Sequence, residues 1–163
     1  MCPLTPEQHD EVMKLAAENH ARQEAMNEAQ RVREHGVQLC LVRAPKDKAV
    51  GDDEFQAELR TFSAVLGETG IKKSQSAITF DAIDAHGYPL PEFMLILKEV
   101  APMAITAATA ICVAWVNARP GRKVRLKIGD VEAEGQNADE IAKLLAQAKD
   151  FQSSDPAKTD DAE

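Results

Sequence analysis

The chain has few of the residues that mark metal, redox or nucleic-acid chemistry. Its three cysteines, Cys2, Cys40 and Cys112, form no C-x-x-C pair and lie far apart, so the sequence indicates neither a zinc site nor a disulfide framework. A net charge of −8 argues against a nucleic-acid binder, because such proteins usually need a basic excess to displace counterions. The sequence carries no catalytic or cofactor signature. We therefore expect no enzymatic activity, cofactor or metal.

The first residues, MCPLTPEQHDEV, contain no basic region followed by an apolar run, so the sequence predicts no secretory signal. This predicts a cytoplasmic protein. Its 163 residues, 44% of them hydrophobic, are enough for one globular core with an appendage and too few for two well-packed domains.

Residues 5–36 are predicted to form a helical arm. Thr5 can cap its first turn with Pro6 at the first helical position, and Gly36 can end it in a left-handed conformation. The apolar positions are sparse, and Asn19 and Gln23 interrupt the apolar stripe. Two interpretations stay open: an arm for homo-oligomerisation or docking, or a solvated helix that lies along the domain.

Residues 37–151 are predicted to form the core domain. Val37 to Arg43 has the length and composition of a strand, a helix begins at Asp52 or Asp53, and Ser76 to Ile83 alternates as a second strand does. This spacing predicts a right-handed crossover that joins two parallel strands. After this domain, the acidic segment 152–163 is predicted to be a disordered tail.

Two helices separated by Pro102 are predicted between Phe93 and Ala118, because proline disrupts a helix interior. Residues 100–118 carry no charge over a length close to that of a bilayer span, so an alternative function is a membrane-associated component that uses this apolar helix. Its many alanines weaken the insertion energy and favour a helix buried in a soluble protein. Trp115, the only tryptophan, could anchor the core or lie at an interface.

A β-hairpin follows, with a two-residue turn at Gly129-Asp130. This turn places Arg125 opposite Glu134 and Lys127 opposite Glu132, so these two cations are predicted to be paired.

Arg119, Arg122 and Lys123, just before the hairpin, have no acidic residue that the sequence places beside them. With Trp115 they form the candidate partner-binding surface, which would suit an acidic protein partner. The competing interpretation is that these cations only complement the C-terminal dipole of the preceding helix.

A final helix is predicted to begin after Asn137, which can cap its first turn.

One cluster of acidic and histidine side chains could support catalysis. Asp81, Asp84 and His86 could bind a divalent metal or transfer protons, which would make the protein a metal-dependent enzyme. Asp and His are also common in turns for local hydrogen bonding, and no supporting ligand set follows, so this is the weakest of the three functional hypotheses.

The elements together predict an α+β fold: a small mixed four-stranded sheet in the order β-α-β-α-α-β-β-α, packed with helices and preceded by the long N-terminal helix. In this setting the stretch AWVNARPGRKVRLKI, from Ala114 to Ile128, followed by a short return strand and a helix with Leu144-Leu145, resembles the Effector-Associated Constant Component family of bacterial conflict-system proteins. The resemblance covers roughly residues 37–151. It implies a non-enzymatic adaptor that accompanies variable effector domains in bacterial or phage conflict and defence.

Overall fold

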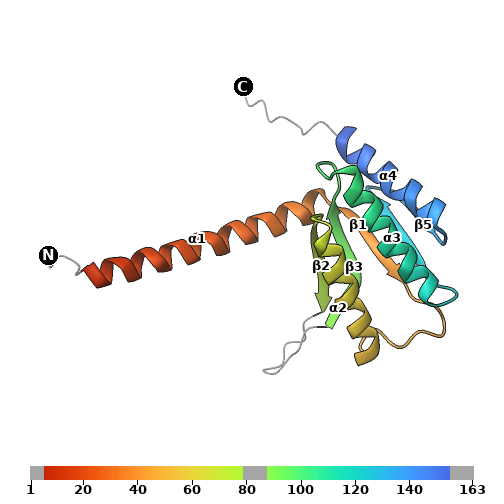
Figure 1. Cartoon of the computed structure of the whole chain (residues 1–163), viewed down its shortest axis with the longest axis horizontal. Helices are drawn as coiled ribbons and strands as arrows, with labels where there is room; N and C mark the ends of the chain where they lie inside the picture. The colour runs from red at the N-terminus through yellow and green to blue at the C-terminus, as the bar shows by residue number, and fades with distance from the viewer. Residues whose placement is uncertain (1–5, 79–87, 155–163) are drawn as a thin grey trace.

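A five-stranded antiparallel sheet with three helices on one face forms the core of the protein (Figure 1). The computed structural model describes residues 6–78 and 88–154. The elements are α1 (Pro6–His35), β1 (Val37–Val42), α2 (Asp53–Glu68), β2 (Lys72–Ile78), β3 (Tyr88–Ile96), α3 (Pro102–Ala118), β4 (Lys123–Ile128), β5 (Val131–Gly135) and α4 (Ala138–Ser154). The predicted α+β class is confirmed, whereas the mixed four-stranded sheet is wrong.

The strand order is β2-β3-β1-β4-β5, and every neighbouring pair is antiparallel. The strands β1 and β2 do run in the same direction, as the predicted crossover requires. They are not neighbours, however, because β3 lies between them and pairs with both. The prediction did not include β3, so it made β1 and β2 parallel neighbours, and the predicted sheet was therefore mixed.

The helix predicted from Phe93 to Glu99 is wrong, since this segment belongs to β3. Its apolar residues occupy both faces: Phe93 and Leu95 are buried under the helices, and Ile96 is buried on the other face. In such a run apolar and polar residues do not alternate, so the sequence does not distinguish a buried strand from a helix. Two prolines, Pro89 and Pro91, are tolerated in this inner strand because pairing with β1 begins only at Glu92 and β2 is irregular opposite them.

The helices α2, α3 and α4 cover one face of the sheet (Figure 1). The strands turn alternate side chains toward these helices: Leu39 and Leu41 from β1, Leu95 from β3, and Val124 and Leu126 from β4 are all buried. The opposite face carries the polar side chains of β4 and β5 and half-buried Cys40.

The hairpin has the predicted register: Arg125 pairs with Glu134, Lys127 with Glu132, and Ile128 with Val131. Gly129 adopts a φ of 57° in the turn, as this turn type requires. The cap of α4 is also as predicted, because the Glu140 amide donates to Asn137 Oδ1 at 3.0 Å. This helix continues to Ser154, three residues past the predicted end of the core.

The helix α1 projects away from the domain and does not lie along it (Figure 1). It contacts β2 and β3 near its C-terminal end, where Val32 is buried and the Glu28 carboxylate binds Lys72 Nζ at 2.7 Å. Gly36 follows the helix without a positive φ, so the predicted left-handed cap is wrong. Glycine is needed there because a Cβ would collide with the Val32 carbonyl oxygen.

No helix in the described part of the chain is long and apolar enough to span a membrane. The uncharged helix α3 instead packs with Cys112, Trp115 and Val116 in the core.

Candidate interaction surfaces

Arg122 lies at the centre of a buried ion-pair network. Its Nε donates to Asp47 Oδ2 and its Nη2 to Asp47 Oδ1, both at 2.9 Å, and Nη2 also reaches Glu58 Oε2 at 2.6 Å. The exposed fraction of the side chain is 1% for Arg122 and 0% for Asp47. Bidentate hydrogen bonds between ionised groups, as between Arg122 and Asp47, are among the strong hydrogen bonds in proteins.

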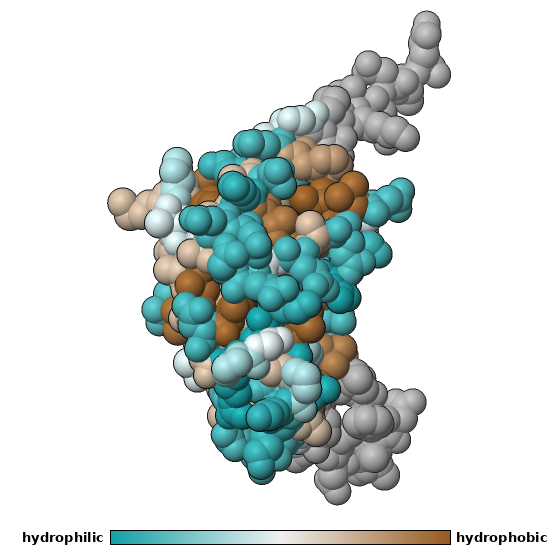
Figure 2. Space-filling model, turned by 90° about the vertical axis from the view of Figure 1, so that its right-hand side faces the viewer, coloured by the Kyte–Doolittle hydropathy of each residue, from teal (hydrophilic) through white to brown (hydrophobic). Residues whose placement is uncertain are grey.

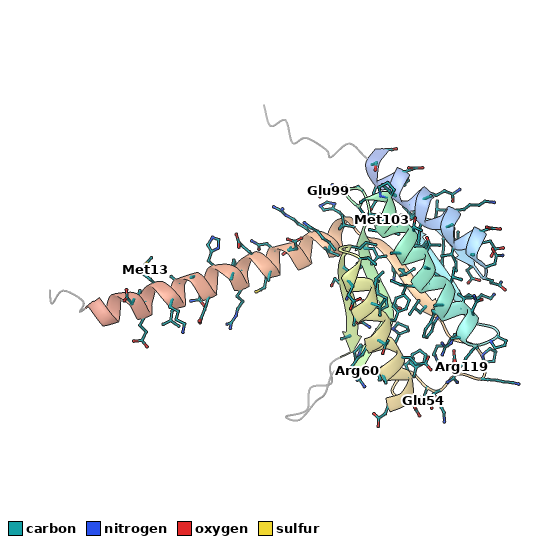
Figure 3. The ribbon with its side chains drawn as sticks, viewed as in Figure 1. Met13, Glu54, Arg60, Glu99, Met103 and Arg119 are labelled. Atoms are coloured by element: carbon teal, nitrogen blue, oxygen red, sulfur yellow. The ribbon has the colours of Figure 1, made fainter. Side chains whose placement is uncertain are left out.

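Arg119 adds a second cation to the same network. Its guanidinium lies 3.0 Å from Glu54 Oε1, 3.3 Å from Glu58 Oε1 and 3.4 Å from Asp47 Oδ1. Figure 3 shows Glu54 and Arg119 at the same end of the helical layer. We call these five residues the ionic cluster: Asp47, Glu54, Glu58, Arg119 and Arg122.

The prediction that Arg119, Arg122 and Lys123 have no acidic neighbour is therefore wrong. The first two belong to the ionic cluster, and Lys123 Nζ binds Glu134 Oε2 at 3.3 Å. On the hairpin, Arg125 contacts both Glu132 at 2.8 Å and Glu134 at 2.6 Å. The unpaired basic patch that pointed to an acidic partner is not present.

Asp47 holds the loop between β1 and α2 in place. Its Oδ2 accepts the Ala44 amide hydrogen at 2.8 Å in addition to Arg122. Burial alone raises the pKa of this carboxyl, but the hydrogen bonds from Arg122 and Ala44 and the charges of Arg122 and Arg119 outweigh it, so the pKa lies below its usual value.

Trp115 joins the ionic cluster to the core. The Arg122 guanidinium carbon lies 3.8 Å from the centre of the indole ring, a cation–π contact. The same ring packs edge-on against Phe55 and Phe62, with centroids 5.8 and 6.2 Å away. Of the two roles predicted for Trp115, the core anchor is confirmed. Its indole Nε1 is buried without a hydrogen-bond partner among the described residues.

An open groove of about 540 Å³ runs between α2 and α3. Its walls are mostly apolar, and the ionic cluster closes one end. The lining residues are Glu54, Ala57, Glu58, Thr61, Phe62 and Val65 from α2, Ile111, Ala114, Trp115 and Ala118 from α3, and Arg122. We call this the α2/α3 groove. Sequence patterns do not show that a groove lies between the two helices.

The surface on the side of the molecule opposite α1 carries both hydrophobic and hydrophilic residues (Figure 2). Figure 2, which views the molecule from that side, shows hydrophobic residues in separate areas between hydrophilic ones. The outward side of α3 carries no charge between residues 102 and 118, and Met103 stands almost fully exposed (Figure 3).

The remaining predicted site falls outside the described residues. Asp81, Asp84 and His86 all lie in the segment 79–87, so the structure places none of them. Within residues 6–78 and 88–154, no group of three or more His, Cys, Asp or Glu side chains could hold a metal ion.

Comparison with known proteins assigns the chain to no family. No family model matches the chain, and neither the curated proteins nor the solved structures contain a significant match.

Proposed function

We propose that this protein is a non-enzymatic interaction module, an adaptor or effector-associated component of a bacterial or phage conflict system. The α2/α3 groove is the observation that carries the proposal. A groove with a mostly apolar lining lies open to solvent between these two helices of the core. The class of system comes from the resemblance of the segment from Ala114 to Ile128 to the Effector-Associated Constant Component family.

The groove suits one amphipathic helix of a partner protein. Its lining on α2 follows three turns of helix, from Glu54 to Val65, and small side chains such as Ala57, Ala114 and Ala118 allow close approach. Recognition of a helix in such a groove uses apolar anchors spaced three and four residues apart.

The charge at the groove end favours a cationic residue on that partner helix. The side chain of Glu54 is 57% exposed, whereas those of Glu58 and Arg119 are each about one-third exposed and Arg122 is buried. The accessible charge is thus mainly carboxylate. This reverses the acidic partner that the sequence predicted, because the cations which suggested it are already neutralised.

The test is co-purification of the full chain with the proteins encoded by the neighbouring genes, first as wild type and then as two variants. Ala114→Glu places a carboxylate in the groove, and Ala110→Glu makes the same change on exposed α3 surface outside it. We expect stoichiometric capture by the wild type and by Ala110→Glu, and loss of capture with Ala114→Glu. Equal capture by both variants would exclude the groove as the binding site.

A membrane-associated role through residues 100–118 has one observation in its favour, the uncharged outward side of α3. Flotation with vesicles of neutral and anionic lipids tests it on the same proteins. Association of the wild type with vesicles, abolished by Met103→Glu, would favour the membrane over a partner helix.

A further inference from the structure

The outer part of α1 is uncovered along its length. The described side chains from Asp10 to Glu28 are all exposed, and this stretch alone amounts to about 28 Å of helix at 1.5 Å per residue. Figure 3 shows Met13 far from the domain. In proteins most helical stability comes from packing against other elements rather than from helix propensity, so packing of this exposed stretch against another element would stabilise it.

One stripe of this helix has the spacing of a coiled coil. Val12, Leu15, Asn19, Arg22 and Met26 follow one another at alternating intervals of three and four residues. The three apolar members are each more than half exposed. In a two-stranded coiled coil such positions face the partner helix, and polar residues among them weaken the pair but fix its alignment.

We propose that α1 pairs with the α1 of a second copy of this chain, in antiparallel orientation. In this pairing, Leu15 packs against the second copy's Met26, and Asn19 lies opposite the second copy's Arg22, whose guanidinium can donate to the asparagine side-chain oxygen. By the helix symmetry, each of these layers occurs twice. The polar layers thereby gain a hydrogen-bond partner.

A parallel pair would be worse on two counts. It would place Arg22 directly against the second copy's Arg22, two like charges in one layer. It would also set the acidic ends side by side, since residues 6–20 contain four carboxylates and a single lysine, whereas residues 21–35 contain three carboxylates and three arginines. Antiparallel pairing places each acidic half beside a neutral half, so the repulsion between like charges is smaller than in a parallel pair.

The antiparallel dimer would carry one globular domain at each end of a helical rod. Each domain keeps its α2/α3 groove, which lies on the helical layer and not on α1. Two grooves on one assembly would bind a multivalent partner with an avidity above that of either groove alone. Dimer formation itself does not depend on the groove, so its test and that of the proposed function can fail separately.

Sedimentation equilibrium of the full chain over a range from about 1 to 500 μM tests the association. With polar residues in the central layers and a short seam, we expect a reversible dimer with a dissociation constant on the order of micromolar to tens of micromolar. Leu15→Glu should weaken the dimer at least tenfold. Met13→Glu is the matched control, because Met13 is similarly exposed (58% against 53% for Leu15) but lies off the stripe.

A protein that remains monomeric throughout this range would overturn the proposal, as would equal weakening by the two variants. Circular dichroism confirms that each variant is folded, which we expect because both positions are exposed.

The orientation is tested by thiol cross-linking, with the products mapped by peptide mass spectrometry. A mixture of Leu15→Cys and Met26→Cys chains should yield the 15–26 cross-link between chains, whereas Leu15→Cys alone should yield little 15–15 product. A dominant 15–15 cross-link would show a parallel pair and refute the antiparallel arrangement.

Discussion

Removal of the Asp47 carboxylate should destabilise the protein far more than removal of a surface carboxylate. In Asp47→Ala the buried Arg122 guanidinium loses two hydrogen bonds of 2.9 Å, and the Ala44 amide loses its acceptor. Breaking a buried ion pair by deleting one partner typically costs about 3–5 kcal/mol. Glu58 remains in contact with Arg122, so we expect the lower end, about 3 kcal/mol.

For a chain of this size, that loss corresponds to a fall in melting temperature of roughly 6–12 °C. The matched control is Glu132→Ala, which removes the exposed ion pair with Arg125 and should shift the melting temperature by about a degree. Urea unfolding can be followed by the fluorescence of Trp115, the only tryptophan, which lies under the Arg122 guanidinium.

A second variant separates the ion pair from simple loss of packing. In Asp47→Ala combined with Arg122→Met, no cation remains buried without its partner, so the double variant should be more stable than Asp47→Ala alone. The reasoning would be refuted if Asp47→Ala cost no more than Glu132→Ala, or if the double variant lost the sum of the two single losses.

The pH dependence supplies an independent check on the same residue. Because the pKa of Asp47 is lower in the folded protein than in the unfolded chain, the carboxylate stabilises the fold above the unfolded pKa of about 3.9. This contribution is lost as the pH falls through the unfolded value toward the folded one. The difference in stability between wild type and Asp47→Ala should therefore be constant near neutral pH and shrink below about pH 4.

Three shorter predictions concern the core. Leu126→Ala should lower the free energy of unfolding by about 2–5 kcal/mol in urea titrations with an unchanged m-value, because this side chain is buried between sheet and helices; a loss below 1 kcal/mol would place it outside the core. Gln152→Ala should cost about 1–3 kcal/mol, since the Gln152 Oε1 accepts the buried Leu97 amide hydrogen at 2.6 Å, whereas Ser153→Ala should be neutral by the same assay. Burial raises the pKa of the Cys112 thiol to about 12, so iodoacetamide at pH 8 should modify it only after unfolding, and rapid labelling of the native protein would contradict its burial.

Local signals predicted much of this fold. The Gly129-Asp130 turn determined the hairpin register in full, because a two-residue turn leaves no freedom in the pairing of its flanking strands. Asp52 and Asn137 start α2 and α4 as their side chains suggest, the former by accepting the Glu54 amide hydrogen. These are interactions between residues a few positions apart, which a sequence displays directly.

The errors arose where the outcome depends on distant residues. β3 has apolar side chains on both faces, so only its place between β1 and β2 identifies it as a strand. Arg122 is separated from Asp47 by 75 positions and from Glu58 by 64, and no local pattern links them. The sequence shows the charges of Arg119, Arg122 and Lys123 but not the carboxylates that pair with them.

These surroundings change how Arg122 should be interpreted in any binding study. It contacts Asp47 in the loop before α2, Glu58 on α2 and the Trp115 ring on α3, so one side chain fixes the two walls of the α2/α3 groove at their common end. Arg122→Glu would place a third carboxylate beside Glu58 and the buried Asp47, at a position where the Arg122 side chain is only 1% exposed, which destabilises the fold itself. Loss of partner capture in that variant would report the collapse of the groove, not a contact made by Arg122. Substitutions of exposed groove residues outside the ionic cluster, such as Ala114→Glu, change the binding surface and keep all five residues of the cluster, so a loss of capture in such a variant reports on the groove itself.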